Sequence, residues 1–169
     1  MLWQRQRLES QDGADGNISE IQYQPMVEIV EVPQEYELAM EAALGSRLQM
    51  LLAQDSQSAL SAVEFLKEKK SGRSSFVALD MSSGSESDSW DQTNLLKEKG
   101  FKALLTDVVV VPASFQKQVS SFLRDVVVVD NIRNAMALRK DYSNLSFVTL
   151  DGDTLTNEGI LTGGTNENV

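Results

Sequence analysis

Two acidic residues separated by one glycine are the first candidate for metal chemistry in this sequence. Asp151-Gly152-Asp153 brings two carboxylates close together, and carboxylate oxygens are ligands that Ca²⁺ and Mg²⁺ prefer. A calcium loop of the EF-hand type needs a further oxygen ligand at its fifth position, which here is Leu155. Asp-Gly is also a frequent pair in tight turns. We therefore interpret the segment as a turn rather than a metal site.

The residue types that are absent exclude several other kinds of chemistry. The 169-residue chain has no cysteine and no histidine, so thiol nucleophiles, disulfides, Ser-His-Asp triads and Cys or His zinc sites are excluded. Gly163-Gly164-Thr165 lacks the lysine of a phosphate-binding P-loop. We expect no catalytic residue, metal or cofactor here. A small α/β enzyme using two carboxylates and Mg²⁺ stays open as an alternative, because 25 acidic residues make any pair of them uninformative.

The charge balance of the chain is acidic, with 25 acidic and 15 basic residues, a formal net charge of −10 and an isoelectric point near 4.5. This balance argues against a dedicated nucleic-acid-binding domain, because phosphate binding needs a clustered basic surface. The densest basic cluster comprises Lys67, Lys69, Lys70 and Arg73. It is interpreted either as a solvated helix end, where cations suit the helix dipole, or as a weak contact to DNA phosphates.

A short apolar run between glycines is the most unusual feature of the sequence. Ile160 and Leu161 follow Gly159 and precede Gly163 and Gly164. Glycines weaken an ordinary strand, but they allow another backbone to approach closely or the chain to bend sharply. An exposed strand edge also pairs readily with another chain. From composition alone, the run fits a contact between subunits and a terminal hairpin with a flexible tail equally well.

The elements that must carry these residues occur twice along the chain. The first half predicts strand, helix, strand, helix and strand, in turn over residues 26–32, 36–44, 48–52, 56–70 and 76–80. The second half predicts the same order over residues 108–111, 115–123, 126–129, 132–137 and 146–151, with Asp130 as the cap of its second helix. Four consecutive valines, Val126–Val129, need apolar contact on both faces of a sheet. The sequence predicts a mixed α/β fold of two related subdomains, each with a small sheet flanked by helices.

Composition also divides the chain into four segments. They are a polar entry segment that begins with the end of a helix (1–24), subdomain I (25–80), a Ser-rich acidic linker (81–97) and subdomain II (98–169). No apolar run approaches the roughly 18 residues of a membrane span, and the first ten residues are too polar for a signal peptide. We therefore expect no membrane partner and a cytoplasmic location.

Several motifs, in order, resemble one known family. Val148-Thr-Leu-Asp-Gly-Asp153 followed by Gly159-Ile-Leu-Thr-Gly-Gly164 resembles the end of the hinge domain of structural maintenance of chromosomes (SMC) proteins. The first half resembles the same hinge in four further stretches: Val30-Glu-Val-Pro-Gln-Glu-Tyr-Glu-Leu-Ala39, Glu41-Ala-Ala-Leu-Gly45, Ala62-Val-Glu-Phe-Leu-Lys67 and Gly72-Arg73. The resemblance covers roughly residues 25–164 and favours the prokaryotic type.

The resemblance implies dimerisation rather than catalysis. In SMC proteins an antiparallel coiled coil joins the hinge to an ATPase head, and two hinges join their arms into a V or a ring that entraps DNA during chromosome condensation and segregation. It implies a chromosome-associated homodimer with two contacts, each between subdomain I of one chain and subdomain II of the other. The interface residues would be Gly159, Ile160, Leu161, Gly163 and Gly164. ATP and Mg²⁺ would belong to the head, which we expect to lie outside this chain.

Two departures from the family pattern bear on these expectations. Many relatives have two glycines where this chain has Glu158-Gly159, and a carboxylate there is expected to weaken or tune the contact. Relatives often carry lysines after the last glycine pair, whereas this chain continues as Thr165-Asn-Glu-Asn-Val169, so little DNA contact is expected there. An alternative is the hinge of a eukaryotic cohesin or condensin subunit, which pairs with a different chain.

Light scattering of the purified chain tests the pairing that the sequence predicts. We expect a mass near twice 18.7 kDa, because two copies would meet at both contacts. A mass of 18.7 kDa would instead favour a hinge that needs a different partner chain.

Replacing Gly163 and Gly164 by bulky β-branched residues is expected to give folded monomers, since close backbone approach would be blocked.

Overall fold

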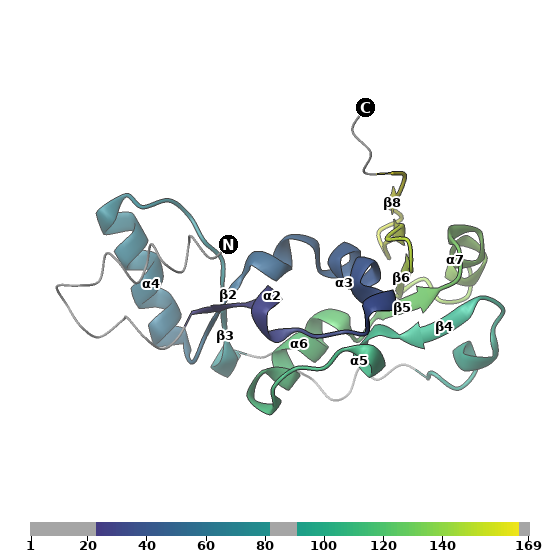
Figure 1. The fold of residues 1–169 in the computed structure, drawn as a ribbon, viewed down its shortest axis with the longest axis horizontal. Coiled ribbons are helices and arrows are strands. Elements are labelled where there is room, and N and C mark those ends of the chain that lie inside the picture. The colour runs from purple at the N-terminus through teal and green to yellow at the C-terminus, as the bar shows by residue number, and fades with distance from the viewer. Residues whose placement is uncertain (1–22, 82–90, 166–169) are drawn as a thin grey trace. The chain divides into compact units, whose positions relative to one another are not determined.

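The computed structural model describes residues 23–81 and 91–165, which divide into two compact units (Figure 1). Among these residues, the first unit contains 23–30, 46–81 and 111–118, and the second contains 31–45, 91–110 and 119–165. The helical stub expected near the N-terminus lies outside the described residues.

A three-stranded mixed sheet forms the framework of the first unit. β1 (Gln24–Pro25) pairs antiparallel with β2 (Leu51–Ala53), and β2 pairs parallel with β3 (Phe76–Ala78). Parallel strands need a crossover connection, which α4 (Ser56–Lys69) provides. The strands predicted near residues 48–52 and 76–80 and the helix between them are therefore confirmed in type.

The two ends of α4 follow from its sequence. The Asp55 side chain accepts a hydrogen bond from the backbone N–H of Ser58 at 2.7 Å, as expected of a helix cap, and this bond lowers the pKa of the Asp55 carboxyl. The helix ends at Lys70, whose φ is +51° and whose N–H donates to the carbonyl oxygens of Leu66 and Lys67.

The core of the first unit lies between α4 and its sheet. Ala62 and Leu66, one helical turn apart, are buried together with Leu51. The Tyr23 ring meets the Phe76 ring edge to face, with 5.6 Å between centroids. The Tyr23 hydroxyl donates to the Ser58 carbonyl at 2.9 Å, so this tyrosine is buried without an unsatisfied polar group.

A five-stranded sheet forms the framework of the second unit, with the strand order β4-β5-β6-β7-β8. The strands are β4 (Phe101–Leu104), β5 (Val126–Val129), β6 (Ser146–Thr149), β7 (Thr154–Leu155) and β8 (Leu161–Thr162). β5 and β6 are parallel, and the other neighbouring pairs are antiparallel. The parallel pair is connected through α7 (Ile132–Arg139).

Both faces of this sheet are covered, as the valine run predicts. Val127, Val128 and Val129 are completely buried. Val127 and Val129 share a core with Ala135 of α7, while alternation along the strand turns Val128 to the opposite face. α3 (Glu37–Leu44) contacts β6, and Figure 1 shows α3 and α7 on opposite sides of that strand.

The strands predicted at the start of each repeat are wrong. Residues 26–32 contain a short helix, α2 (Met26–Ile29), and the strand predicted over 108–111 is preceded by another, α5 (Leu105–Val108), which includes its first residue. One helical turn buries Met26 and Leu105 completely, and this burial outweighs the β propensity of the neighbouring valines. After each helix only an isolated bridge remains, in which Glu31 and Val110 donate to each other's carbonyls at 2.9 and 2.7 Å.

The structure adds a strand before each of these short helices. β1 lies antiparallel on β2 with Pro25 opposite Leu51, and β4 lies antiparallel on β5 with Leu104 opposite Val127. The 3-10 turns after α2 and α5 also correspond: η1 (Gln34–Tyr36) leads into α3, and η6 (Ala113–Phe115) leads into α6 (Gln116–Leu123). Further 3-10 turns are η2 (Gly45–Gln49), η3 (Leu79–Met81) and η5 (Leu95–Lys97).

The compact units do not coincide with contiguous halves of the chain. Residues 31–45 come from the first repeat but belong to the second unit, where α3 contacts β6. Residues 111–118 come from the second repeat but belong to the first unit, where buried Gln118 donates from Nε2 to the Leu79 carbonyl at 2.6 Å. Leu95, in the predicted linker, is completely buried in the core of the second unit.

The start of α7 is packed against a glycine that precedes β4. Asn131, rather than the expected Asp130, caps α7, because its side chain accepts from the N–H of Asn134 at 2.9 Å. The Asp130 carboxylate accepts instead from Asn134 Nδ2 at 2.8 Å. Gly100, with φ +92°, lies so close that an added Cβ would be 2.7 Å from the Asn134 Cβ.

We predict that Gly100→Ala lowers the free energy of unfolding by about 3 kcal/mol, since it combines an unfavourable φ with a clash against α7. Gly72→Ala is the matched control, because Gly72 has φ +96° and nothing within 4 Å of the added Cβ. Urea denaturation of both variants separates the cost of the unfavourable φ from the cost of the clash against α7. Equal losses would mean that the close approach to α7 costs nothing.

Candidate functional site

The glycine-flanked run forms the last hairpin of the five-stranded sheet. β7 and β8 pair antiparallel, with Leu155 opposite Leu161 and Thr154 opposite Thr162. β8 is the outermost strand, so its second edge has no strand partner among the described residues. Its backbone groups on that side are left to solvent or to another chain.

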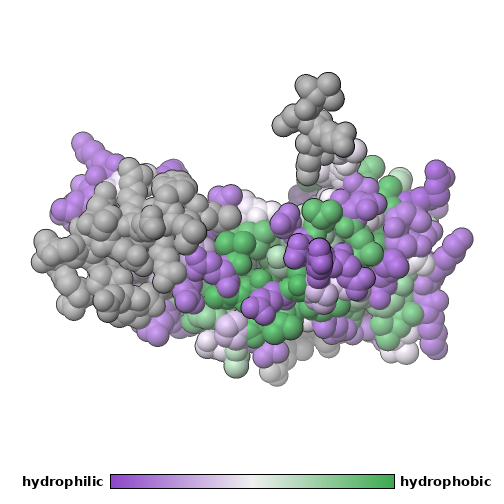
Figure 2. All heavy atoms as spheres, viewed as in Figure 1, coloured by the Kyte–Doolittle hydropathy of each residue, from purple (hydrophilic) through white to green (hydrophobic). Residues whose placement is uncertain are grey.

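The side chains of this hairpin change from buried to exposed between its two strands. Leu155 is buried in the core under α7, and Leu161 lies on the same face because directly opposed residues of antiparallel strands share a face. Leu161 is nevertheless 53% exposed, and Ile160 is 54% exposed. Figure 2 shows hydrophobic surface among hydrophilic residues where Figure 1 labels β6 and β8. Two adjacent large apolar side chains on an open strand edge are typical of an interaction surface.

Gly159 is required by the turn between the two strands. Its φ is +87°, which side chains other than glycine rarely adopt, and its N–H donates to the Thr156 carbonyl at 2.9 Å. Thr156 closes the turn twice more, because its N–H donates to the Ile160 carbonyl at 3.0 Å and its Oγ1 accepts from the Ile160 N–H at 3.1 Å. This glycine therefore has a role within one chain.

Gly163 and Gly164 are held against Asp153. A Cβ on Gly163 would be 2.7 Å from Asp153 Oδ1, and the N–H of Gly164, where φ is +121°, donates to the same oxygen at 3.4 Å. The Asp153 backbone is fixed in turn by buried Thr149, whose Oγ1 accepts from the Asp153 N–H at 3.1 Å. The sequence analysis assigned both glycines to a contact between chains. It did not identify Asp153, eight residues before the start of β8, as their partner within one chain.

The Asp151-Gly152 pair forms the expected tight turn. The N–H of Gly152, with φ +89°, donates to the Thr149 carbonyl at 3.0 Å, and the Thr149 N–H donates to the Asp153 carbonyl at 2.9 Å. In the described parts of the chain, no three acidic side chains are grouped as metal ligands. Nor does any helix there have the length and apolar character needed to cross a bilayer.

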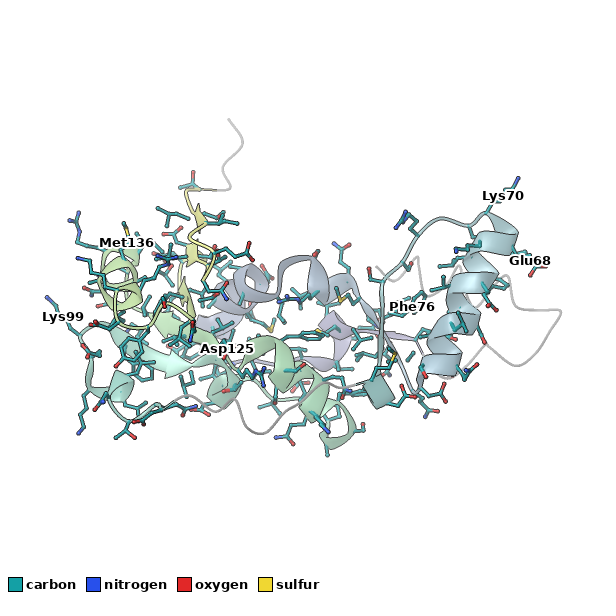
Figure 3. The ribbon with its side chains drawn as sticks, turned by 180° about the vertical axis from the view of Figure 1, so that it is seen from behind. Glu68, Lys70, Phe76, Lys99, Asp125 and Met136 are labelled. Carbon is teal, nitrogen blue, oxygen red and sulfur yellow. The ribbon has the colours of Figure 1, made fainter. Side chains whose placement is uncertain are left out.

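The cluster of Lys67, Lys69, Lys70 and Arg73 lies in the first unit, at the end of α4 and in the loop that follows. Lys67 and Lys69 occupy the last turn of α4, and Lys70 is its C-cap residue; all three are exposed. Figure 3 shows Lys70 projecting away from the end of this helix. Arg73 instead lines a polar recess of about 240 Å³ with Ser46, Gln49, Met50, Ser74 and Ser75.

A second open strand edge belongs to the three-stranded sheet. β3 is outermost in the order β1-β2-β3, so one of its edges also has no strand partner in the described residues. Phe76 and Val77 are half-buried there, and Ala78 is buried. Each unit therefore carries a short outer strand with apolar residues.

Comparison with known proteins identifies the family. The family model of the flexible hinge domain of SMC proteins matches residues 20–139. The chain is 35% identical over 131 residues to the chromosome partition protein Smc of Methanocaldococcus jannaschii, covering 78% of this chain and 11% of that protein. It is 28% identical over 140 residues to Smc of Bacillus subtilis, covering 82% and 12%. The chain thus spans about a tenth of the length of these relatives.

Solved structures of SMC hinge domains have the same fold as this chain. The SMC hinge domain of Pyrococcus furiosus superposes with a TM-score of 0.69 at 27% identity, covering 96% of this chain and 84% of that one. The hinge domain of Geobacillus stearothermophilus SMC shares the fold, with a TM-score of 0.78 at 24% identity, covering 99% and 74%. Hinge domains of this kind are non-catalytic and carry no cofactor. The chain belongs to the SMC flexible hinge domain family, and its curated relatives are prokaryotic chromosome partition proteins.

Proposed function

We propose that this hinge domain joins two copies of its parent chain through two equivalent contacts. Each contact would combine subdomain I (residues 25–80) of one copy with subdomain II (98–169) of the other. The interface residues on subdomain II would be Gly159, Ile160, Leu161, Gly163 and Gly164. The observation that carries the proposal is the exposure of Ile160 and Leu161, each more than half, where the chain enters β8, a strand whose outer edge has no strand partner among the described residues.

Pairing at this edge is favourable for two physical reasons. A strand added to β8 satisfies backbone N–H and C=O groups in a regular ladder. It also removes Ile160 and Leu161 from water, and burying the exposed half of such a side chain contributes about 1 kcal/mol. Because the second contact closes within an already joined pair, its effective concentration is high, and avidity rises about 10²- to 10⁴-fold.

The open edge of β3 is the partner we propose for β8. Phe76 and Val77 offer apolar surface at the rim of the three-stranded sheet, and β3 and β8 are both short, with three and two residues. The G. stearothermophilus hinge structure, which shares this fold, is described as an asymmetric dimer, so it supports association of two copies but not the equivalence of the two contacts. Two contacts per dimer require that each copy supply one edge from each of its sheets, which β3 and β8 can provide.

The remaining parts of the proposal concern the longer parent protein. We infer that coiled-coil arms leave this hinge toward ATPase heads that hold ATP and Mg²⁺, and that the resulting V or ring entraps chromosomal DNA in the cytoplasm. Support comes from the curated relatives, which are chromosome partition proteins and of which this chain spans only 11% and 12%. Lys67, Lys69, Lys70 and Arg73 would add at most a weak DNA contact, given the net charge of −10.

We predict that Leu161→Glu converts the dimer into folded monomers. The change places a charge at both contacts of a symmetric dimer, and the dissociation constant should rise at least about 100-fold. Leu161 is 53% exposed in a single chain, so the free energy of unfolding should change by less than about 1 kcal/mol. Light scattering and urea denaturation measure the two effects.

The matched control is Leu60→Glu, which makes the same change at a leucine of α4 that is 49% exposed. A dimer that survives Leu161→Glu, or dissociates equally with Leu60→Glu, would contradict the proposed interface. Substituting Gly163 and Gly164 is a less clean test, because Gly163 contacts Asp153 within the same chain. A wild-type chain that stays monomeric would favour a hinge with a different partner chain.

The basic cluster gives a separate prediction. Replacing Lys67, Lys69 and Lys70 by glutamine should weaken binding of a short labelled duplex at low salt and flatten its salt dependence by about one unit per lost phosphate contact. Fluorescence anisotropy measures both quantities. The same change at Lys97, Lys99 and Lys102 is the control of equal charge, and an equal effect there would show only the general influence of net charge.

A further inference from the structure

The turn that precedes β8 is held from outside the hairpin by one arginine. Arg139 is the last residue of α7, and its Nη2 donates to the backbone carbonyl of Asn157 at 3.1 Å. The other polar backbone group of Asn157 is also bonded, because its N–H donates to Ser146 Oγ of β6 at 3.1 Å. Asn157 is therefore tied to a helix and to a central strand at once.

The guanidinium of Arg139 also lies directly against Gly159. A Cβ added to Gly159 would be 3.4 Å from Arg139 Nη2 and 3.9 Å from its Cζ. The flat guanidinium thus fills the space beneath the turn that the glycine leaves open. Gly159 and Arg139 form one local arrangement, in which the glycine provides the left-handed turn and the arginine supports it.

The burial of Arg139 shows that its position is constrained. Its Nε is buried and has no hydrogen-bond partner among the described residues. Burying a cationic donor without a partner is unfavourable, so the bond from Nη2 to the Asn157 carbonyl must help to hold the side chain in place. A side chain free to move would bring Nε into water.

We propose that Arg139 is a positioning residue for the dimer strand: by fixing Asn157 and Gly159 it presents Ile160 and Leu161 outward in the orientation that pairing needs. The inference rests on the proposed dimer function. Ile160 directly follows the supported turn, and its N–H and carbonyl are both bonded to Thr156 within it. A loosened turn would therefore change the direction of β8, and the dimer would need to restore that order when it forms.

The test compares Arg139→Met with Arg133→Met in the full 169-residue chain. Methionine keeps an unbranched apolar stem but no donor, and Arg133 is an exposed arginine on the same helix, so the two changes are chemically equal. Hydrogen exchange of the Thr156, Gly159 and Ile160 amides reports on the turn. Light scattering over a dilution series reports on the dimer.

In Arg139→Met we expect these three amides to exchange about tenfold faster and the dimer dissociation constant to rise about tenfold, as loss of one charge-assisted bond implies. Amides of β5 and β6 should keep their wild-type rates, which a general loss of stability would not allow. Arg139→Lys keeps a donor and should recover most of both effects, to within about threefold of wild type.

If Arg139→Met behaves like Arg133→Met, or if the turn loosens while the dissociation constant stays unchanged, the positioning role is overturned. If wild type shows no dimer at any concentration, the proposed function fails, while the exchange rates still report whether Arg139 supports the turn. Faster exchange throughout the second unit would show a structural role only and would likewise overturn the inference.

Discussion

A strand at the rim of a sheet carries backbone N–H and C=O groups that only water or another strand can satisfy, and β8 is such a strand. Its neighbour β7 still contributes Leu155 to the core under α7, but Leu161, directly opposite, is more than half exposed. Apolar side chains of the sheet therefore continue onto β8, one strand beyond the part that α7 covers. The proposed pairing of two copies depends on this difference, since a solvated edge without apolar side chains would gain little by association.

The repeat gives the chain two units, each with its own sheet and its own outer strands. Each copy builds a strand, a short buried helix, a turn, a longer helix and a parallel pair, and Glu31 and Val110, at corresponding positions, bond to each other. The copies also exchange segments, because residues 31–45 belong to the second unit and residues 111–118 to the first. Because of this exchange, neither repeat forms a compact unit from its own residues alone.

The three glycines near β8 show that a residue type can have two explanations. Their spacing in the sequence indicates close approach between chains, whereas the structure provides a reason within one chain for each: the turn over Arg139 for Gly159, and the Asp153 carboxylate for Gly163 and Gly164. These contacts within one chain are compatible with an interface between two chains. A hairpin whose turn and end are both fixed by its own chain presents its open edge with little ordering left to be done on binding.

The sequence alone determined the features that depend on local chemistry. Asp55 as a helix cap, the tight turn at Gly152, the buried valines of β5 and the repeated order of the longer helices and parallel strands follow from capping, turn and burial preferences of short segments. The valine-rich starts of both repeats were misread as strands because local β propensity does not reveal that Met26 and Leu105 become completely buried. The tertiary structure decided that point, the exchange of segments between units and the partners of Gly159 and Gly163. These depend on contacts between residues far apart in the chain, such as Arg139 with Asn157, and no local pattern in the sequence records which distant segments meet.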